Sequence, residues 1–227
     1  MKTTVSVIIP TLDEREHITA ALDLLQERRR AGHEVIVVDG GSDDGTCEVA
    51  SGKADRILNS PRGRAIQMNA GAREAHGGIL LFLHADTLVP DVSFRVFLEE
   101  FPSSGRVWGR FDVRLSGSHR MLRVVENMMN IRSRLSGIAT GDHGIFVRRE
   151  TFEKVGGYPE IPLMEDVAIS RRLKRQSRPF FPRGHVVTSS RRWEENGIRK
   201  TILLMWRLRL AYALGADPAD LARSYHP

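Results

Sequence analysis

Two polar residues, His84 and Asp86, follow an apolar run at residues 79–83 that predicts a buried strand. A carboxylate fixed at the end of such a strand is a hard oxygen ligand of the kind that Mg²⁺ and Mn²⁺ prefer. A nearby imidazole can bind a metal or orient the carboxylate. The alternative is a turn after the strand, in which Asp86 only caps the chain end. The two residues alone leave both interpretations open.

A pair of adjacent carboxylates, Glu165 and Asp166, precedes a predicted helix. Asp166 could simply be the N-cap of this helix. A cap needs only one carboxylate, however, and a pair held by the proline-bounded loop at residues 159–162 also suits a general base. Both interpretations remain open on the residues alone.

Other charged residues stand at the ends or beginnings of predicted elements. Asp39 follows an apolar run at 34–38 and precedes two glycines, so it either forms a turn or faces a ligand. Arg64 stands at the start of a predicted helix, where free backbone N–H groups already attract anions; an exposed arginine is the alternative. Asp13 and Glu16 have the spacing of a capping box and predict the start of the first helix.

Strands and helices must alternate to bring these residues together. The sequence predicts strands at 5–9, 34–38, 56–58, 79–86 and 144–149, and helices ending near residue 30 and spanning 47–50, 63–76 and 149–157. This order is typical of a doubly wound, mostly parallel α/β sheet flanked by helices, in which ligands bind at the carboxyl ends of the strands. The acidic loops at 10–14, 39–44 and 84–86 are therefore expected at one edge of the sheet.

Composition narrows the classes of protein that fit. A chain of 227 residues with 41% hydrophobic content can bury one sizeable core, and no linker or repeat divides it. The single cysteine, Cys47, excludes a disulfide framework and a cysteine-based zinc site. With only a short apolar run at the N-terminus, a cytoplasmic protein is expected. The net charge of +6 favours anionic partners.

Five segments occur in an order and spacing that resemble family 2 glycosyltransferases with the GT-A fold. They are SVIIPTLDE, VIVVDGGSDDGT, GRAIQMNAGAREAHGGILLFLHADT, GGYPEIPLMEDVAISRRLKR and SRRW, and the resemblance covers about residues 3–195. FLHADT, RSRLSGIATGDHGIFVRRE and PLMEDV are most similar to the bacterial branch labelled radical-SAM/selenodomain-associated transferase 2, which is tied to arsenosugar biosynthesis. The resemblance implies a GT-A catalytic domain at 1–195 and a C-terminal helical extension, packed on it, at 196–227.

The resemblance also implies a site for a nucleotide-diphosphate sugar, linked to UDP or GDP. Its residues would be Pro10, Thr11 and Glu14 in the nucleotide pocket, Asp39 at the base, Arg64 along the donor, Asp86 as the last aspartate of the DxD motif, and Arg192 with Trp193 of a QxxRW-like signature. Asp86 would hold a divalent cation, Mn²⁺ or Mg²⁺, across the diphosphate. Arg191 or Arg192 would add a second contact to the phosphate.

This chain departs from the family pattern at two positions. His84 replaces the first aspartate of the motif, and it either binds the metal or, as we favour, orients Asp86. Ser189 stands where processive members carry Gln or Arg, which favours single transfer over polymerisation. The implied mechanism is an inverting displacement in which Asp166, with Glu165 as the alternate, takes the acceptor proton.

The C-terminal stretch at 197–227 predicts an amphipathic helix that is too interrupted to span a bilayer. Its basic half carries Arg199, Lys200, Arg207 and Arg209, and its apolar half carries Leu204, Met205, Leu208 and Tyr212. Such a helix can pack against the catalytic domain or a second copy in a homodimer. It can also lie on an anionic membrane at the inner face, near a lipid-linked acceptor. Packing is the commoner use.

Two other classes share some of these features. A nucleotidyltransferase would use a similar fold and an acidic metal edge, but its first loop is usually glycine-rich and basic, whereas TLDEREH is acidic. A nucleic-acid-binding module would explain the basic charge. The basic residues are not interleaved with aromatics, however, and the chain has only three tyrosines and three tryptophans, so no nucleic-acid partner is expected.

Overall fold

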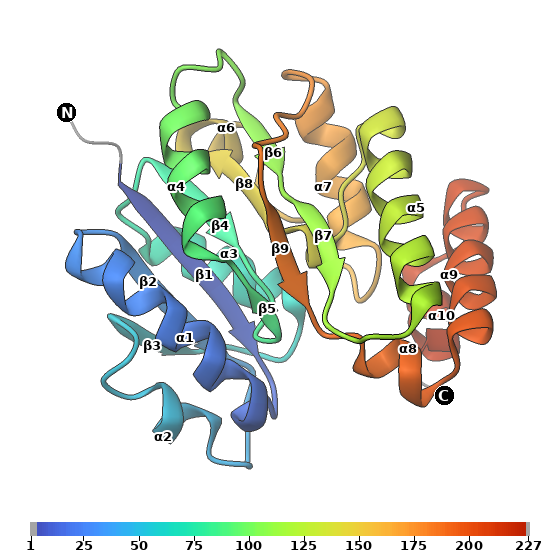
Figure 1. Ribbon diagram of the computed structural model, residues 1–227, viewed down its shortest axis with the longest axis horizontal. Helices are drawn as coiled ribbons and strands as arrows, with labels where there is room; N and C mark the ends of the chain where they lie inside the picture. The colour runs from blue at the N-terminus through green and yellow to red at the C-terminus, as the bar shows by residue number, and fades with distance from the viewer. Residues whose placement is uncertain (1–3, 226–227) are drawn as a thin grey trace.

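The computed structural model describes residues 4–225 and alternates strands with helices over most of that length (Figure 1). The elements are β1 (Val5–Thr11), α1 (Arg15–Arg30), β2 (Glu34–Asp39), α2 (Thr46–Ala50), β3 (Arg56–Asn59), α3 (Arg64–Glu74), β4 (Ile79–Phe82), β5 (Thr87–Leu88), α4 (Asp91–Glu100), β6 (Trp108–Arg110), β7 (Asp112–Leu115), α5 (Arg120–Ser136), the 3₁₀ turn η1 (Gly141–His143), β8 (Ile145–Arg148), α6 (Arg149–Lys154), α7 (Glu165–Lys174), β9 (His185–Thr188), α8 (Arg191–Glu195), α9 (Ile198–Ala213) and α10 (Pro218–Tyr225).

The central sheet has six strands in the order β3-β2-β1-β4-β8-β6. The first four strands of this order run parallel, and β8 is antiparallel to both of its neighbours. The predicted α/β class with a mostly parallel sheet is therefore confirmed. Because β1 lies between β2 and β4, the carboxyl ends of these three strands meet at one edge of the sheet.

Alternate residues of each central strand enter two different hydrophobic clusters. In β1, Val7 and Ile9 pack with α1 and α4 on one face, whereas Ile8 packs with α3, α6 and α7 on the other. All three of these side chains are fully buried. A strand that is covered on both faces needs a run of apolar residues, which explains VIIP at residues 7–10, while the buried hydroxyl of Ser6 before it donates to Glu34.

A second, three-stranded sheet, in the order β5-β9-β7, covers part of the face that α1 and α4 share. β5 pairs antiparallel with β9, and Thr87 Oγ1 donates a hydrogen bond to Thr188 Oγ1 over 3.0 Å. This pairing holds the segment that follows Asp86 beside the segment that precedes Arg191. Two regions far apart in the sequence are thereby fixed at the same end of the molecule.

Some local predictions were wrong. The capping box does not form: α1 has Glu14 as its N-cap, and Asp13 instead accepts a hydrogen bond from the backbone N–H of Asp43 over 3.1 Å. The strand expected at 79–86 ends at Phe82, so His84 and Asp86 lie in the loop between β4 and β5. One hydrogen bond to β1 continues beyond the end of β4: the N–H of Leu83 donates to the carbonyl of Ile8.

The C-terminal stretch forms two helices, α9 and α10, after the short helix α8. The predicted apolar half of α9 packs inward: Leu204, Met205, Leu208 and Tyr212 join Leu163, Met164 and Val167 at the start of α7, with Leu221 of α10. Within residues 4–225, no helix is both long and apolar enough to cross a bilayer. The boundary between residues 195 and 196 stays a prediction.

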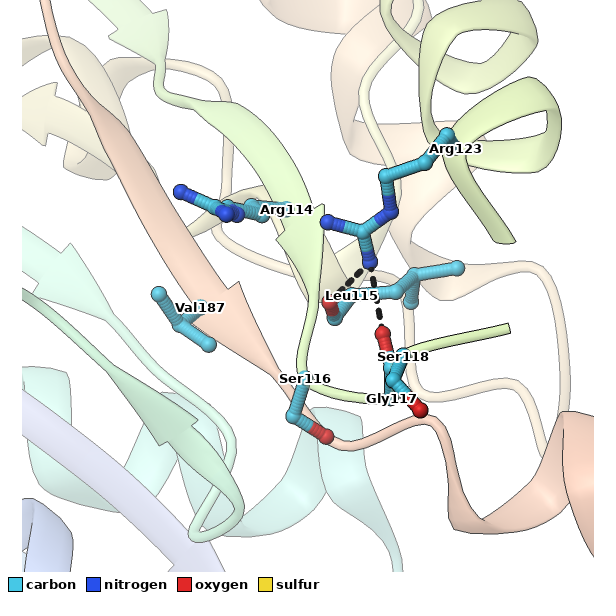
Figure 2. Close-up of a pocket in the computed structure, with 7 residues that line it drawn as sticks. All are labelled: Arg114, Leu115, Ser116, Gly117, Ser118, Arg123 and Val187. Atoms are coloured by element: carbon cyan, nitrogen blue, oxygen red, sulfur yellow. Dashed lines mark hydrogen bonds between the residues drawn. The ribbon is translucent and has the colours of Figure 1, made fainter. Parts of the chain in front are cut away.

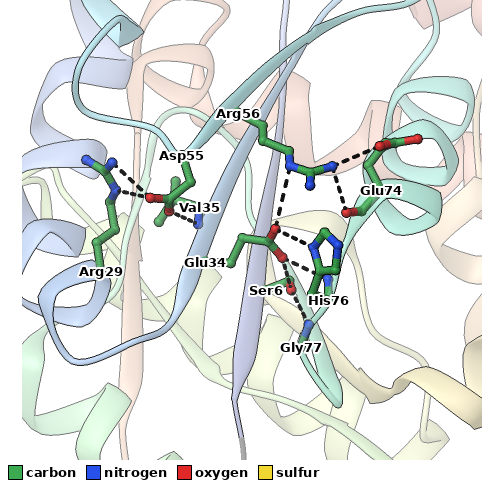
Figure 3. A network of polar contacts seen from close by, with 9 residues as sticks. All are labelled: Ser6, Arg29, Glu34, Val35, Asp55, Arg56, Glu74, His76 and Gly77. Carbon is green, nitrogen blue, oxygen red and sulfur yellow. Dashed lines mark hydrogen bonds and ion pairs between the residues drawn. The ribbon is translucent and has the colours of Figure 1, made fainter.

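A network of polar side chains joins the amino ends of the parallel strands, opposite the edge where the acidic loops lie (Figure 3). Glu34 lies at its centre and is 18% exposed. Its Oε2 accepts hydrogen bonds from Ser6 Oγ at 2.5 Å and from the N–H of His76 at 2.9 Å. Burial opposes ionisation of Glu34, but the hydrogen bonds from Ser6 and His76 outweigh it and lower its pKa.

Replacing Glu34 with glutamine should destabilise the fold in a pH-dependent way. A carboxyl with a lowered folded-state pKa contributes stability above its ordinary value of 4.5, and this contribution is lost as pH falls through the folded-state pKa. We expect Glu34→Gln to lower the free energy of unfolding by about 1–3 kcal/mol at pH 7, and by less at pH 4. Urea denaturation at both pH values measures this.

The matched control is Glu74→Gln, because the Glu74 carboxylate is 52% exposed in its ion pair with Arg56. This variant should change stability by no more than about 0.5 kcal/mol. An equal loss for Glu34→Gln at the two pH values would show that its charge plays no part in the network.

Candidate functional site

The ends of β1 and β2 lie side by side in register. Thr11 pairs with Asp39, and the N–H of Gly40 donates to the carbonyl of Thr11 over 2.9 Å. The side chain of Gln67 in α3 links the two strand ends, because its Nε2 donates to the carbonyls of Thr11 at 2.7 Å and Val38 at 2.8 Å. Both loops that follow the strands therefore start from a rigid base.

The Asp39 carboxylate is buried and its two oxygens are fully engaged within the protein. Oδ2 accepts from the N–H groups of Gly41 and Ser42, both at 2.8 Å, while Oδ1 accepts from Ser42 Oγ at 2.5 Å and Thr11 Oγ1 at 3.1 Å. Burial opposes its charge, but these donors outweigh burial and lower the pKa of Asp39. A nucleobase can reach this carboxylate only by replacing one of these donors.

The two loops also bind each other directly. The N–H of Asp13 donates to Ser42 Oγ and the N–H of Glu14 donates to Thr46 Oγ1, both at 2.9 Å. Asp13 has a backbone φ of 54°, in the left-handed region that few residues other than glycine adopt. Strained backbone of this kind is common at functional sites and is held by its surroundings.

Glu14 and Asp86 bring two carboxylates together between the β1 and β4 loops. Glu14 Oε2 is buried and has no hydrogen-bond partner among residues 4–225. Burial and the neighbouring charge of Asp86 raise the pKa of Glu14, while His17, Arg191 and His84 act in the opposite direction. An unpartnered buried carboxylate oxygen beside a second carboxylate is the arrangement that a cation would stabilise.

The His84 imidazole turns toward the 3₁₀ turn η1. Its Nδ1 lies 3.5 Å from Asp142 Oδ1, and a Cβ added at Gly141 would overlap the ring. Glycine is therefore required at position 141 for the imidazole to approach. Burial disfavours the charged imidazole, but Asp142 outweighs it and raises the pKa of His84. This contact fits a His84 that orients the β4 loop, and direct metal binding stays a prediction.

The acidic pair lies in the first turn of α7. Met164, with a φ of 69°, is the N-cap, so the interpretation of Asp166 as the N-cap is wrong. Asp166 Oδ2 accepts from the N–H of Gly141 at 3.0 Å and Oδ1 accepts from the N–H of Val167 at 2.6 Å. Glu165 is only 5% exposed. Burial, reinforced by Asp166, raises the pKa of Glu165.

A small cavity joins the acidic pair to the β4 loop. Its volume of about 10 Å³ is close to that of one water, and its lining includes His84, Gly141, Tyr158, Glu165 and Asp166. Residues from β4, η1 and α7 therefore converge on one point. This is the arrangement expected if a proton acceptor is to lie near the strand-end loops.

Two arginines offset the negative charge here. Arg64, the first residue of α3, has an exposed side chain and lies within electrostatic range of Glu165 and Asp142. Arg132 of α5 lies within range of Asp166 and Asp142. Its Nε and Nη2 are buried and have no hydrogen-bond partner in the described part of the chain. Unpaired buried donors of this kind suit an anionic group on a bound molecule.

Arg192 and Trp193 of the QxxRW-like signature, and Arg191 before them, point to different places. Arg191 Nη1 lies 2.6 Å from His17 Nε2, near Glu14. The Arg192 guanidinium stacks over the ring of Tyr225, with Cζ 3.6 Å from the ring centroid. Trp193 packs against the hydrophobic cluster on the α1 and α4 face of the central sheet, which we call the main cluster. This geometry favours Arg191 over Arg192 as the arginine that faces the strand-end loops.

The donor set suits a cation that is only partly bound by protein. No group of three histidine, cysteine, aspartate or glutamate side chains within residues 4–225 converges on one point. Asp86 and Glu14 nevertheless offer carboxylate oxygens, and one Glu14 oxygen is unpartnered. Mg²⁺ and Mn²⁺ often keep most of their ligands as waters and phosphate oxygens, so the residues present fit such an ion.

A larger hollow of about 540 Å³ lies elsewhere, between the end of β7, the loop 116–118 and α5 (Figure 2). Arg114, Arg123 and Val187 line it, and none of the predicted site residues does. Figure 2 shows that the Arg123 guanidinium bonds the loop itself, by donating to the carbonyls of Leu115 and Gly117. This hollow is therefore separate from the strand-end site.

Sequence reasoning missed Asp142, Arg132 and Tyr158. Asp142 had a local signal, because it stands between glycines in GDHG directly before an apolar run. Arg132 and Tyr158 had none, because their approach to Asp166 depends on how α5 and the loop after α6 pack.

The comparison with protein families decides the affiliation of the chain. Residues 6–156 match the model of "Glycosyl transferase family 2", which is more than half of the chain. The chain belongs to glycosyl transferase family 2. This family match covers the strand-end residues from Pro10 to Asp86 and also Asp142, but it ends before α7.

Named relatives are similar over only part of their lengths. Glycosyltransferase AglE of Haloferax volcanii is 38% identical over 91 residues, which is 36% of this chain and 30% of that protein. The chain therefore spans less than half the length of the curated relatives that match it first, at 30% and 45%.

Solved structures of other proteins share the fold. S. aureus TarS 1-349 in complex with UDP has a TM-score of 0.67 at 17% identity, over 82% of this chain and 60% of that chain. The mannosyltransferase PcManGT from Pyrobaculum calidifontis, in complex with GDP-Man and Mn²⁺, has a TM-score of 0.65 at 22% identity, over 93% and 61%. These likenesses confirm the predicted GT-A fold.

The raised pKa of Glu165 makes a testable statement about stability. A carboxyl with a raised folded-state pKa contributes stability below its ordinary value of 4.5, and this contribution is lost as pH rises through the folded-state pKa. At pH 8 the wild type must bury a charge that glutamine lacks. We expect Glu165→Gln to be more stable than wild type by about 1–3 kcal/mol at pH 8, with little difference at pH 4.

Chemical denaturation of both proteins across this pH range measures the difference. Glu153→Gln, at an exposed position on α6, is the control and should match wild type throughout. A Glu165→Gln variant that is equally or less stable than wild type at pH 8 would contradict the raised pKa.

Proposed function

We propose that this chain transfers a sugar from a nucleoside-diphosphate sugar to an acceptor hydroxyl or other nucleophile with inversion at the anomeric carbon. One observation carries the proposal: the carboxylates at the ends of β1, β2 and β4 and the acidic pair of α7 lie at the same edge of the sheet, joined through η1. Membership of family 2 supports the reaction class. The strand-end location is where ligands bind in open α/β sheets.

The donor proposal rests on the loops after β1 and β2. Pro10, Thr11 and Glu14 would border the nucleoside, and Asp39 would hold loop 40–42 in the shape that receives the base. Proteins with this fold have solved structures in complex with UDP, with UDP-GlcNAc and with GDP-Man, which supports a UDP- or GDP-linked donor here. The sugar stays unnamed.

Asp86 and Glu14 would hold a divalent cation, Mn²⁺ or Mg²⁺, with His84 orienting the loop between them and η1. When bound, such a cation supplies positive charge opposite the diphosphate of the donor. Arg191, beside Glu14, would contribute a second positive charge to the same group. Trp193 would act by packing, since it lies in the main cluster.

Asp166 is the proposed general base, with Glu165 as the alternate. The hydrogen bonds from Gly141 and Val167 fix its carboxylate, and the small cavity lies beside it. Burial raises its pKa, so that it holds a proton more firmly than an exposed aspartate. A base of this kind accepts the acceptor proton as the new bond forms.

Four finer predictions belong to the proposal. Ser189 in place of Gln or Arg suggests transfer of a single sugar. The free donors of Arg132 suggest an acceptor with an anionic group, which includes a lipid phosphate. The likeness to the radical-SAM/selenodomain-associated transferase 2 branch and a cytoplasmic location stay predictions.

A panel of nucleotide sugars tests the reaction class. Incubation with Mn²⁺ should release a nucleoside diphosphate from one or a few donors by slow hydrolysis in the absence of acceptor, as measured by chromatography. Release of pyrophosphate from a sugar phosphate and a nucleoside triphosphate would instead identify a nucleotidyltransferase.

Asp86→Ala should remove metal-dependent binding while leaving the fold intact, because Asp86 lies in a loop and not in the core. We expect the affinity for UDP or GDP in the presence of Mn²⁺ to fall by at least about tenfold, measured by calorimetry. Asp23→Ala, on the exposed side of α1, is the control and should bind as wild type does. Unchanged affinity in Asp86→Ala would remove Asp86 from the proposed site.

Asp166→Asn should lower turnover by roughly a hundredfold to ten-thousandfold with little change in donor affinity. Its remaining activity should no longer rise with pH as the wild-type activity does when the base loses its proton. The amide offers one oxygen where two backbone N–H groups need acceptors, so thermal unfolding must confirm that the variant is folded. Wild-type turnover in this variant would transfer the role to Glu165.

A further inference from the structure

Exposed apolar side chains concentrate on two helices. Eight of the eleven large apolar residues that are exposed within residues 4–225 belong to α5 or to α9 and the residue after it. On α5 they are Val124, Met128, Ile131 and Leu135, with exposed fractions of 47%, 41%, 58% and 84%. Their spacing of three or four residues places them on one face of the helix.

The second helix repeats the pattern. Leu203, Trp206, Leu210 and Leu214 are exposed by 71%, 64%, 63% and 80%, again at intervals of three or four residues. α9 packs beside α5 along one side of the molecule (Figure 1). We call these eight side chains the α5/α9 face. The two stripes lie on neighbouring helices of the folded chain.

The α5/α9 face is not left over from incomplete packing of α9. The inward side of this helix is already buried, because Leu208 is 1% exposed and packs with Leu163, Met164 and Val167. α5 likewise buries Leu122 and Val125 in the main cluster. Each helix therefore carries a second apolar stripe whose side chains remain 41–84% exposed.

The charges around the face have one dominant sign. Together α5 and α9 contain eight arginine or lysine residues and one acidic residue, Glu126. Arg120, Arg199, Lys200 and Arg207 are exposed beside the apolar stripes. A helix with an apolar stripe, a tryptophan and flanking basic residues is typical of a segment that lies in the plane of a membrane surface.

We propose that the α5/α9 face binds the surface of a bilayer that contains anionic phospholipids. In this arrangement Trp206 and the leucines of α9 enter the boundary between headgroups and acyl chains, and the arginines contact lipid phosphates. A symmetric dimer through the same face is disfavoured, because it would bring two sets of like charges together. The same charges attract an anionic lipid surface.

The proposal goes beyond sugar transfer, but it has a consequence for the site. α5 also carries Arg132, whose unpartnered nitrogens lie within electrostatic range of Asp166 and Asp142. Docking through the outer side of α5 would therefore place the acceptor side of the site next to the lipid surface. An acceptor anchored in the bilayer could then reach the proposed base without leaving the membrane.

Vesicle flotation tests the proposal without requiring a substrate. The full chain is mixed with vesicles of phosphatidylcholine alone or of phosphatidylcholine with phosphatidylglycerol, and floated in a density gradient. We expect flotation with the anionic vesicles at low salt, little with the neutral vesicles, and a large loss in about 1 M NaCl, where the Debye length is about 3 Å.

The decisive variant is Leu203→Glu/Leu210→Glu, with Ile131→Glu as an independent test on α5. Each change should lower the partition coefficient for anionic vesicles by at least about tenfold, because an exposed leucine or isoleucine no longer enters the bilayer. Val92→Glu is the matched control: Val92 is 61% exposed but lies on α4, outside the face, so this variant should float like wild type. Circular dichroism confirms that all variants are folded.

Two results would overturn the proposal. The first is wild-type protein that stays at the bottom of the gradient with anionic vesicles at low salt. The second is a Leu203→Glu/Leu210→Glu variant that floats as well as wild type and Val92→Glu. If wild type does not float but light scattering shows a dimer that the double variant disrupts, the face binds a second copy.

Discussion

The parallel pairing of β1 with both β2 and β4 determines where the proposed site residues can lie. Thr11 and Asp39 are direct partners in this register, and the β4 loop leaves the sheet next to them because Phe82 pairs with Ile8. A slip of one residue in either pair would turn the buried side chains of these strands to the opposite face. The fully buried residues of β1 make such a slip costly, since both faces of the strand are packed.

The polar groups at the two ends of the parallel strands differ in how their hydrogen bonds are satisfied. At the amino ends, Ser6, Glu34 and His76 satisfy one another through short hydrogen bonds, which is the pattern of a network that contributes stability. At the carboxyl ends, some polar groups are left incomplete: Glu14 Oε2 and the Nε and Nη2 of Arg132 are buried without partners in the described chain. Incomplete groups of this kind carry a cost in free energy unless a ligand completes them. Unpartnered arginine nitrogens also occur elsewhere, as at Arg28 and Arg149. The function is placed at the carboxyl ends because only there does an unpartnered carboxylate oxygen of the described chain, that of Glu14, lie near a second carboxylate, Asp86.

The sequence predicted β1, β2 and β4 well because each is an apolar run that ends in a polar loop, whereas β3, which reads RILN and alternates between half-buried and exposed residues, gave a weaker signal. It did not predict α4, α5, β6, β7 or β9, whose residues mix polar and apolar types: β7 reads DVRL and has an alternating burial pattern. The antiparallel pairing of β8 with β4 could not be predicted from the sequence either, since a buried strand has the same composition in either direction.

For the candidate site, the strand-end residues could be placed from sequence because chain order brings them together. The contacts that join these loops to the acidic pair of α7 could not be predicted from the sequence. The approach of His84 to Asp142 requires the glycine at position 141, and the bond from Gly141 to Asp166 joins segments that are 25 residues apart. The outer apolar stripe of α5 was missed because the helix itself was not predicted, and because a sequence pattern does not show which faces stay uncovered after folding.

The most direct test of the central claim is paramagnetic broadening of backbone amide signals by Mn²⁺ in the presence of UDP or GDP. We expect the signals from residues 11–14, 39–42, 84–87 and 141–142 to broaden strongly, and those from residues 34, 55–56 and 76–77 at the other end of the sheet to stay sharp. Broadening centred on the amino ends of the strands, or spread evenly over the protein, would contradict a nucleotide and metal site at the carboxyl ends.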